Sequence, residues 1–203
     1  MGLAVFGFGI SFGVLARAAG MGVWAPIVMS ASTFAGSAQF AAMSIAGAGG
    51  TLAAAIGAAL LLNARYVPIG ISVSPSLSGG VGSRFVQGQL TVDESWALAA
   101  TGDGRFDPRT LVAAGLALYM GWVSGTTIGV VAGNVLGDPS KLGLDAAFPA
   151  LFLALLAPQL TTPRERAVAG VGGLIALALI PVVPLGVPII AASAACLLGA
   201  WRR

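Results

Sequence analysis

The sequence predicts an all-α integral membrane protein with about seven transmembrane helices, or six, in a single domain covering residues 1–203. The chain is 57% apolar and only 8% charged, and its mean hydropathy is +0.95. Soluble domains carry about three times that share of charged residues. Several apolar runs approach the length of about 20 residues that a helix needs to cross the hydrocarbon core. The 30 glycines fit this class, because small residues let membrane helices pack closely.

The apolar runs define seven expected crossings, at about residues 3–19, 22–46, 51–73, 111–136, 146–160, 167–183 and 186–201. The run 22–46 is interrupted at Ala35–Gln39, which predicts a broken helix. A break at mid-membrane exposes backbone polar groups and is tolerated only against protein or a water-filled cavity. Residues 74–110 form a polar connection, in which 85–100 are expected to be an interfacial or re-entrant helix.

The positive charges predict the orientation, since cytoplasmic loops of membrane proteins are enriched in lysine and arginine. If residues 74–110 are cytoplasmic, only Lys141 lies outside and Arg65 lies within the membrane. The expected topology has the N-terminus outside and the C-terminus in the cytoplasm. The positive charges then placed in the cytoplasm are Arg17, Arg84, Arg105, Arg109, Arg164, Arg166, Arg202 and Arg203.

Glycine recurs at every fourth position of the fourth crossing. This spacing repeats the small-xxx-small pattern and predicts a close helix contact. The expected partner is the first crossing, whose Gly9 and Gly13 have the same spacing, or a helix of a small second subunit. Residues 9–16 also resemble residues 125–132, which suggests halves at 1–100 and 110–203 related by an inverted repeat. The recurring glycines are Gly121, Gly125, Gly129 and Gly133.

An amide and a guanidinium stand inside the apolar run 51–73, at Asn63 and Arg65. Arginine at the bilayer centre costs roughly 2.5–3.5 kcal/mol, so it needs a partner, water or a ligand. One interpretation is that Arg65 extends to the nearer interface. The other is that Asn63 and Arg65 line a polar cavity that binds an anionic group. Broken helices often form such sites, so Gly36, Ser37 and Gln39 are further candidate binding residues. The alternative for Gln39 is that its side-chain amide hydrogen-bonds to a neighbouring helix.

Two acidic residues, Asp93 and Glu94, lie among apolar neighbours in a chain with few charges. They are either solvated loop residues or partly buried carboxylates that carry a coupling proton. The chain has no histidine and no phosphate-binding loop, so we expect no catalytic residues, no metal site and no cofactor. The dispersed basic residues indicate no nucleic-acid partner; the lipid bilayer is the expected environment.

Three motifs, in order and spacing, resemble the AzlC family: Phe34–Phe40 (FAGSAQF), Leu62–Tyr66 (LNARY) and Leu90–Ser95 (LTVDES). The similarity extends over nearly the whole chain, although the N-terminus is shorter than usual and Tyr66 replaces a common histidine. The resemblance implies the large subunit of an exporter of leucine, isoleucine or valine in the bacterial inner membrane. It also implies a small partner subunit of the AzlD type.

Together, the residues and the resemblance predict a proton-coupled exporter subunit for small apolar amino acids. Arg65 would bind the substrate carboxylate, and Asp93 or Glu94 the ammonium group or a proton. Gln39 and the broken-helix backbone would bind either end of the zwitterion. The alternatives are a transporter of another small solute and a membrane scaffold subunit that transports nothing.

Overall fold

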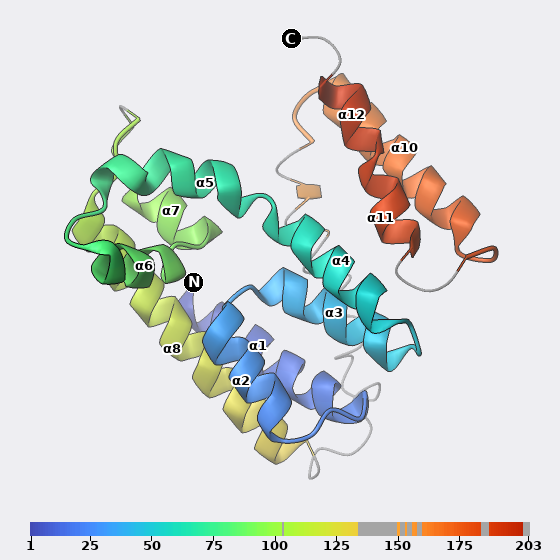
Figure 1. The fold of residues 1–203 in the computed structure, drawn as a ribbon, viewed down its shortest axis with the longest axis horizontal. Helices are drawn as coiled ribbons and strands as arrows, with labels where there is room; N and C mark the ends of the chain where they lie inside the picture. The colour runs from blue at the N-terminus through green and yellow to red at the C-terminus, as the bar shows by residue number, and fades with distance from the viewer. Residues whose placement is uncertain are drawn as a thin grey trace.

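The computed structural model describes residues 1–102, 104–133, 150, 153, 156, 157, 160–183 and 187–200, and within them the fold is all-α (Figure 1). An isolated bridge between Ala100 and Phe106 is the extended pairing found there. Most of the expected crossing at 146–160 lies outside the described residues. The helices are α1 (Gly2–Ala18), α2 (Trp24–Thr33), α3 (Gly36–Gly47), α4 (Leu52–Asn63), α5 (Tyr66–Val73), the 3-10 turn η1 (Ser74–Ser76), α6 (Val81–Gln89), α7 (Asp93–Ala99), α8 (Pro108–Ala132), α10 (Pro163–Leu179), α11 (Val187–Ser193) and α12 (Ala195–Ala200).

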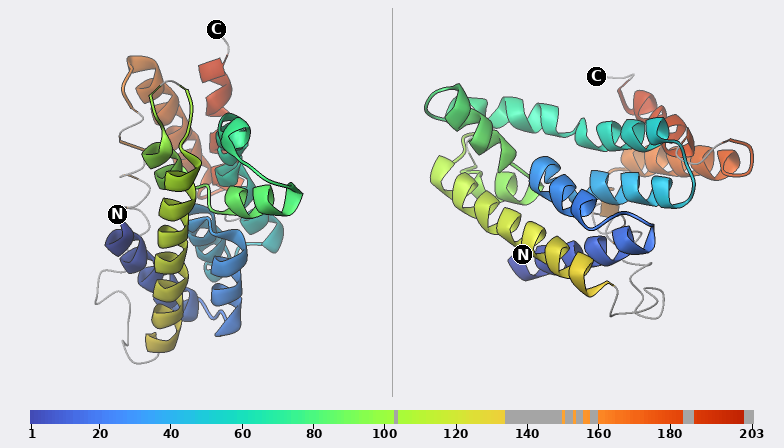
Figure 2. Two further views of the ribbon diagram at one scale, coloured as in Figure 1. Left: turned by 90° about the vertical axis from the view of Figure 1, so that its left-hand side faces the viewer. Right: turned by 60° about the horizontal axis from the view of Figure 1, so that its bottom comes forward.

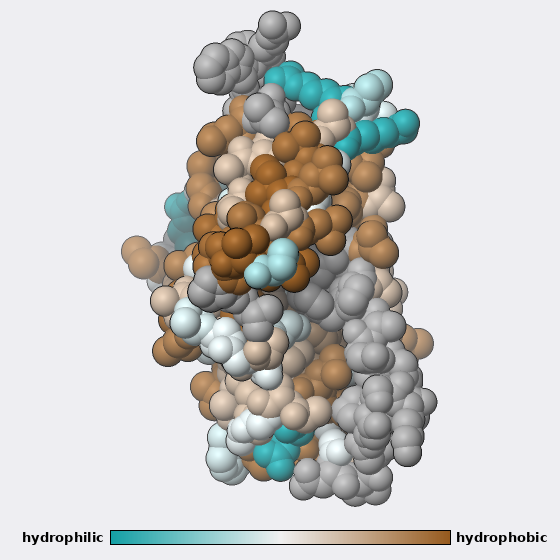
Figure 3. Space-filling model, turned by 90° about the vertical axis from the view of Figure 1, so that its right-hand side faces the viewer, coloured by the Kyte–Doolittle hydropathy of each residue, from teal (hydrophilic) through white to brown (hydrophobic). Residues whose placement is uncertain are grey.

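Two helical stretches in the described part are long and apolar enough to cross a bilayer, Leu52–Ser76 and Pro108–Ala132. Gly2–Ala18 and Val187–Leu197 are shorter apolar helices. Leucine, isoleucine and valine side chains project outward from α4, α5, α8 and α10. The side of the molecule on which α10–α12 lie is likewise mostly hydrophobic outside the grey atoms (Figure 3). These outward apolar faces fit a helical membrane protein, as the sequence predicts.

Helices α1 and α8 cross in close contact at their glycines. A Cβ on Gly9 would lie 2.7 Å from the Trp122 carbonyl oxygen, and one on Gly13 would overlap the Thr126 carbonyl oxygen. In return, Cβ atoms on Gly125 and Gly129 would overlap the carbonyl oxygens of α1 at Phe6 and Ile10. Residue numbers rise together along the two helices, so α1 and α8 run parallel. The inversion expected between these two segments is therefore not found.

The run 22–46 does not cross the molecule: it forms a re-entrant hairpin of α2 and α3 (Figure 1). The chain turns at Phe34, whose φ of 42° and ψ of 51° are left-handed. Gly36, just after the turn, lies against the Trp122 ring, halfway along α8. Gly47, at the end of α3, lies against Ala19, at the end of α1. The chain thus returns to the side it left, which corrects the expected single crossing.

The run 51–73 is also divided, into α4 and α5, with a kink at Ala64 and Arg65 (Figure 2, right). Pro68 explains the kink, because a proline removes one helical hydrogen bond and its ring clashes with the carbonyl of the residue four before it. That residue is Ala64. The stretch Leu52–Ser76 is still long and apolar enough for the expected crossing, but it is divided at this point.

Helices α6 and α7 form a second, shorter hairpin from the opposite end of α8. Its turn lies deeper than its ends: Leu90 lies against Gly115, whereas Ala99 and Phe106 pack with Leu111 near the start of α8. Asp107 begins α8, accepting hydrogen bonds from the Arg109 and Thr110 backbone N–H groups. Hydrogen bonds from the side chain and backbone of Thr110 hold the pKa of Asp107 below its usual range.

The parallel course of α1 and α8 also corrects the predicted topology. Arg17 ends α1 beside Gly133, at the C-terminal end of α8, whereas Arg109 lies in the first turn of α8. Arg17 and the residues that lead into α8 therefore lie at opposite ends of α8. With the N-terminus outside and Arg17 in the cytoplasm, residues 74–110 cannot also be cytoplasmic. The reason is that the re-entrant hairpin takes the place of one of the expected crossings.

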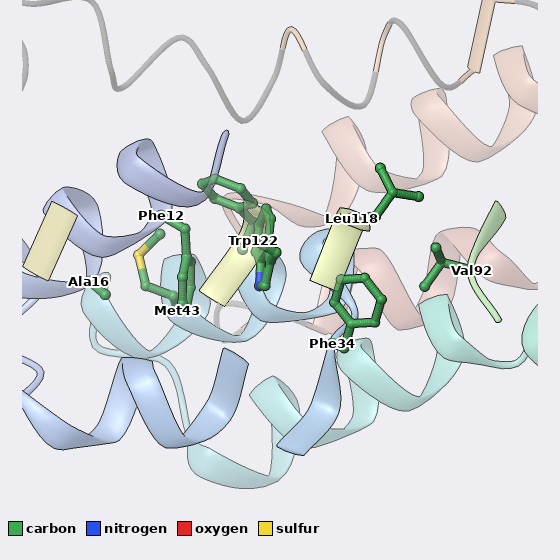
Figure 4. Close-up of a cluster of buried hydrophobic side chains, with 8 residues drawn as sticks. Phe12, Ala16, Phe34, Met43, Val92, Leu118 and Trp122 are labelled. Carbon is green, nitrogen blue, oxygen red and sulfur yellow. The ribbon is translucent and has the colours of Figure 1, made fainter. Parts of the chain in front are cut away.

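An aromatic core joins these elements at mid-height (Figure 4). Phe12 stacks on Trp122 with ring centroids 5.9 Å apart, and Phe40 meets Phe12 edge to face at 5.4 Å. Phe34 and Val92, from the turns of the two hairpins, belong to the same cluster. The core thus holds the two hairpin turns next to each other.

Candidate functional site

The turns of the two hairpins meet the α4–α5 kink around a cavity of about 80 Å³. Its polar wall comes from three breaks in helical structure: α3 begins at Gly36, α5 follows Arg65, and α7 begins at Asp93. Its apolar wall comes from α1, α8 and the residues beside the breaks. The lining residues are Val5, Phe8, Phe34, Gly36, Ser37, Arg65, Tyr66, Val92, Asp93, Glu94 and Trp122. Five of the seven residues predicted for binding or proton coupling are among them.

Arg65 links the hairpins through one nitrogen. Its Nη2 donates to Ser37 Oγ at 2.9 Å and forms an ion pair with Asp93 Oδ2 at 2.9 Å. Its Nε–H is buried and has no hydrogen-bond partner within the described part of the chain. The guanidinium is a planar fork suited to grip a carboxylate with two N–H groups. Because the Nε–H is unpaired among the described residues, the fork still has a donor to offer.

The ion pair is accessible, since the side chains of Arg65 and Asp93 are 35% and 32% exposed. Each partner therefore has a face on which a ligand carboxylate or ammonium group can make contact.

Local hydrogen bonds position Asp93 and Glu94 in the first turn of α7. Ser95 Oγ accepts from the Val92 N–H at 2.9 Å and donates to the Leu90 carbonyl at 2.9 Å, which fixes the helix start. Trp96 Nε1 donates to Ser72 Oγ at 2.9 Å and ties α7 to α5. Asp93 and Glu94 both line the cavity, and Asp93 forms the ion pair with Arg65 there.

Gln39 does not line this cavity. It is fully buried, and its Nε2 donates to Ser30 Oγ at 2.9 Å while its Oε1 accepts from Trp122 Nε1 at 3.0 Å. Ser30 Oγ is also 2.9 Å from Thr126 Oγ1. The amide thus joins α2, α3 and α8, as in the alternative that the sequence left open for Gln39.

Asn63 lies at the end of α4, also outside the lining residues. Its Oδ1 is buried without a hydrogen-bond partner among the described residues. The structure therefore brings Arg65, but not Asn63, to the cavity. Their binding roles remain predictions.

Two contributors to the site were missed at the sequence level. Pro68 produces the kink that presents Arg65, and a proline within an apolar run was the available signal. Phe34 adopts a left-handed conformation that bulky residues rarely adopt, and such outliers concentrate at functional sites. No sequence signal marked that conformation.

The chain matches the family model described as AzlC protein over residues 1–136. The chain belongs to the AzlC family. The matched residues include both hairpins, the kink and every residue lining the cavity. The chain is also similar to an uncharacterized membrane protein of Archaeoglobus fulgidus, with 32% identity over 197 residues that cover 94% of this chain and 85% of the relative. No solved structure matches the chain.

This AzlC protein is thus a helical membrane protein whose family-matched part contains an arginine–carboxylate site between two opposed re-entrant hairpins.

Proposed function

We propose that this AzlC protein is the membrane subunit of a secondary transporter that exports small apolar amino acids, the branched-chain ones foremost, in exchange for protons. The observation that carries the proposal is the accessible Arg65–Asp93 ion pair at three helix breaks. Discontinuous helices are a recurrent substrate site in secondary transporters. An amino-acid zwitterion has one group of each sign, so it can replace both halves of such a pair.

In this mechanism the substrate carboxylate binds the Arg65 fork, and the substrate ammonium binds Asp93 and Glu94. Ser37, which now accepts from Arg65, helps hold the guanidinium in place. A proton and the substrate ammonium compete for the same carboxylates. Mutually exclusive binding of substrate and proton is the requirement for exchange, so inward movement of protons can drive export.

The orientation is part of the proposal. Arg84, Arg105 and Arg109 lie within residues 74–110, and Arg109 is at one end of α8, whereas Arg17 lies at the other. Because cytoplasmic loops are enriched in positive charge, the proposal has these three arginines at the cytoplasmic face of the plasma membrane. The small AzlD-type subunit is expected to cover part of the apolar surface.

Counterflow of labelled leucine in proteoliposomes, with and without the small subunit, tests the function. Arg65→Lys keeps the charge but loses the fork, and we expect at least about a tenfold loss of leucine counterflow, the size of one lost charge-assisted contact. Arg109→Lys, on the exposed start of α8, is the matched control. Wild-type counterflow in Arg65→Lys would refute the recognition role, and counterflow only of another solute would redirect the substrate assignment.

A further inference from the structure

A second cavity, of about 220 Å³, adjoins the ionic one. One wall is a single face of α5 formed by Tyr66, Ile69, Gly70 and Val73, which follow helical spacing. The other walls come from the end of α2, Leu77 and the α6–α7 turn. Phe34 and Tyr66 line both cavities and therefore form a wall that the two spaces share.

The volumes differ in what they accommodate. An apolar cavity of about 150 Å³ holds benzene, so 220 Å³ is sufficient for a branched aliphatic group. The ionic cavity of about 80 Å³ is too small for an entire leucine. We propose that the larger cavity, called here the side-chain chamber, receives the aliphatic side chain of the substrate and that Gly70 sets its size limit. This inference rests on the proposed function.

Of the two shared wall residues, Phe34 is fixed by its surroundings. It is 6% exposed and meets Tyr119 edge to face at 5.1 Å, and the Tyr119 hydroxyl donates to the Ala31 carbonyl at 2.8 Å. The Tyr66 ring instead lies 5.2 Å from the Arg65 guanidinium carbon. Tyr66 is therefore the wall that moves when the ion pair opens and the substrate side chain enters the chamber.

Gly70 is a suitable position for a substitution, because a Cβ added there would meet no atom within 4 Å. Gly70 lines the chamber and is exposed, so a larger side chain can be added at its rim without forcing helices apart. Gly170 on α10 is a matched control, since its Cβ would also meet nothing within 4 Å and it lines neither cavity.

The experiment measures the dissociation constants of leucine and alanine for the purified protein by isothermal titration calorimetry. Gly70→Val should weaken leucine binding about tenfold relative to alanine binding, the usual effect of a few methyl groups in an apolar pocket. Gly170→Val should leave the ratio unchanged. Ile69→Ala enlarges the chamber and should shift the preference toward phenylalanine.

The outcomes separate the two proposals. If Gly70→Val weakens both ligands equally, or if neither Gly70→Val nor Ile69→Ala changes the ratios, the chamber does not hold the side chain and this inference is wrong, while amino-acid recognition stands. If the wild-type protein binds neither amino acid, alone or with its small subunit, the proposed function fails as well.

Discussion

The α1–α8 crossing provides a direct test of helix packing, because two glycines of the same row have different surroundings. A Cβ on Gly129 would overlap the Ile10 carbonyl oxygen, whereas a Cβ on Gly121 would lie 3.4 Å from the Gly2 carbonyl oxygen, an ordinary contact. Two helices that cross at an angle are closest at one point, and here that point lies near Gly125 and Gly129. Gly129→Ala and Gly121→Ala therefore differ in packing but share the same gain in helix propensity.

Overpacking of this kind costs about 1–3 kcal/mol. For a chain of this length that loss lowers the melting temperature by about 2–12 °C. Gly129→Leu, with a bulkier side chain, should prevent assembly altogether. The assay is the melting temperature and monodisperse yield of each variant in mild detergent, measured by gel filtration after heating.

Gly121→Ala displaces nothing and gains helix propensity, so it should melt at the wild-type temperature or up to about 4 °C above it. Equal melting temperatures for Gly129→Ala and Gly121→Ala would refute the close crossing. A stable Gly129→Leu with altered substrate preference would show instead that the glycines line a transport path.

Three further predictions concern the site. Leucine affinity should fall as the pH falls, because protons compete with the substrate ammonium. Asp93→Asn or Glu94→Gln should flatten this pH dependence of the leucine dissociation constant in calorimetric titrations. If both variants keep the wild-type pH profile, neither carboxylate is the site of competition. Gln39→Leu should destabilise the protein by about 1–3 kcal/mol, since the Trp122 indole N–H loses its buried acceptor; a loss of leucine binding at an unchanged melting temperature would instead support the binding role predicted from the sequence. Tyr66→Ala should join the two cavities and reduce the discrimination between leucine and phenylalanine, and an unaltered ratio of their dissociation constants would argue against Tyr66 as the moving wall.

The sequence by itself determined the class of the protein and singled out the three charged residues that line the cavity. Few charges and long apolar runs can be accommodated only by a helical membrane protein. In such a chain an arginine and two carboxylates away from the termini are conspicuous, because each must find a polar environment. Arg65, Asp93 and Glu94 could therefore be named before their distances were known.

Only the tertiary structure decided the course of the chain and the separation of Gln39 from the cavity. A run of 25 residues, such as 22–46, is long enough for one crossing or for two half-length helices. The choice depends on whether the polar groups near the turn find hydrogen-bond partners, and those partners are remote in sequence. In the α2–α3 hairpin, Gln39 pairs with Trp122 and Ser30 with Thr126. The Ser32 carbonyl accepts from Gln89 Nε2 at 2.7 Å. Because hydropathy records the length of an apolar run and not these contacts, the sequence predicted a crossing where the chain turns back.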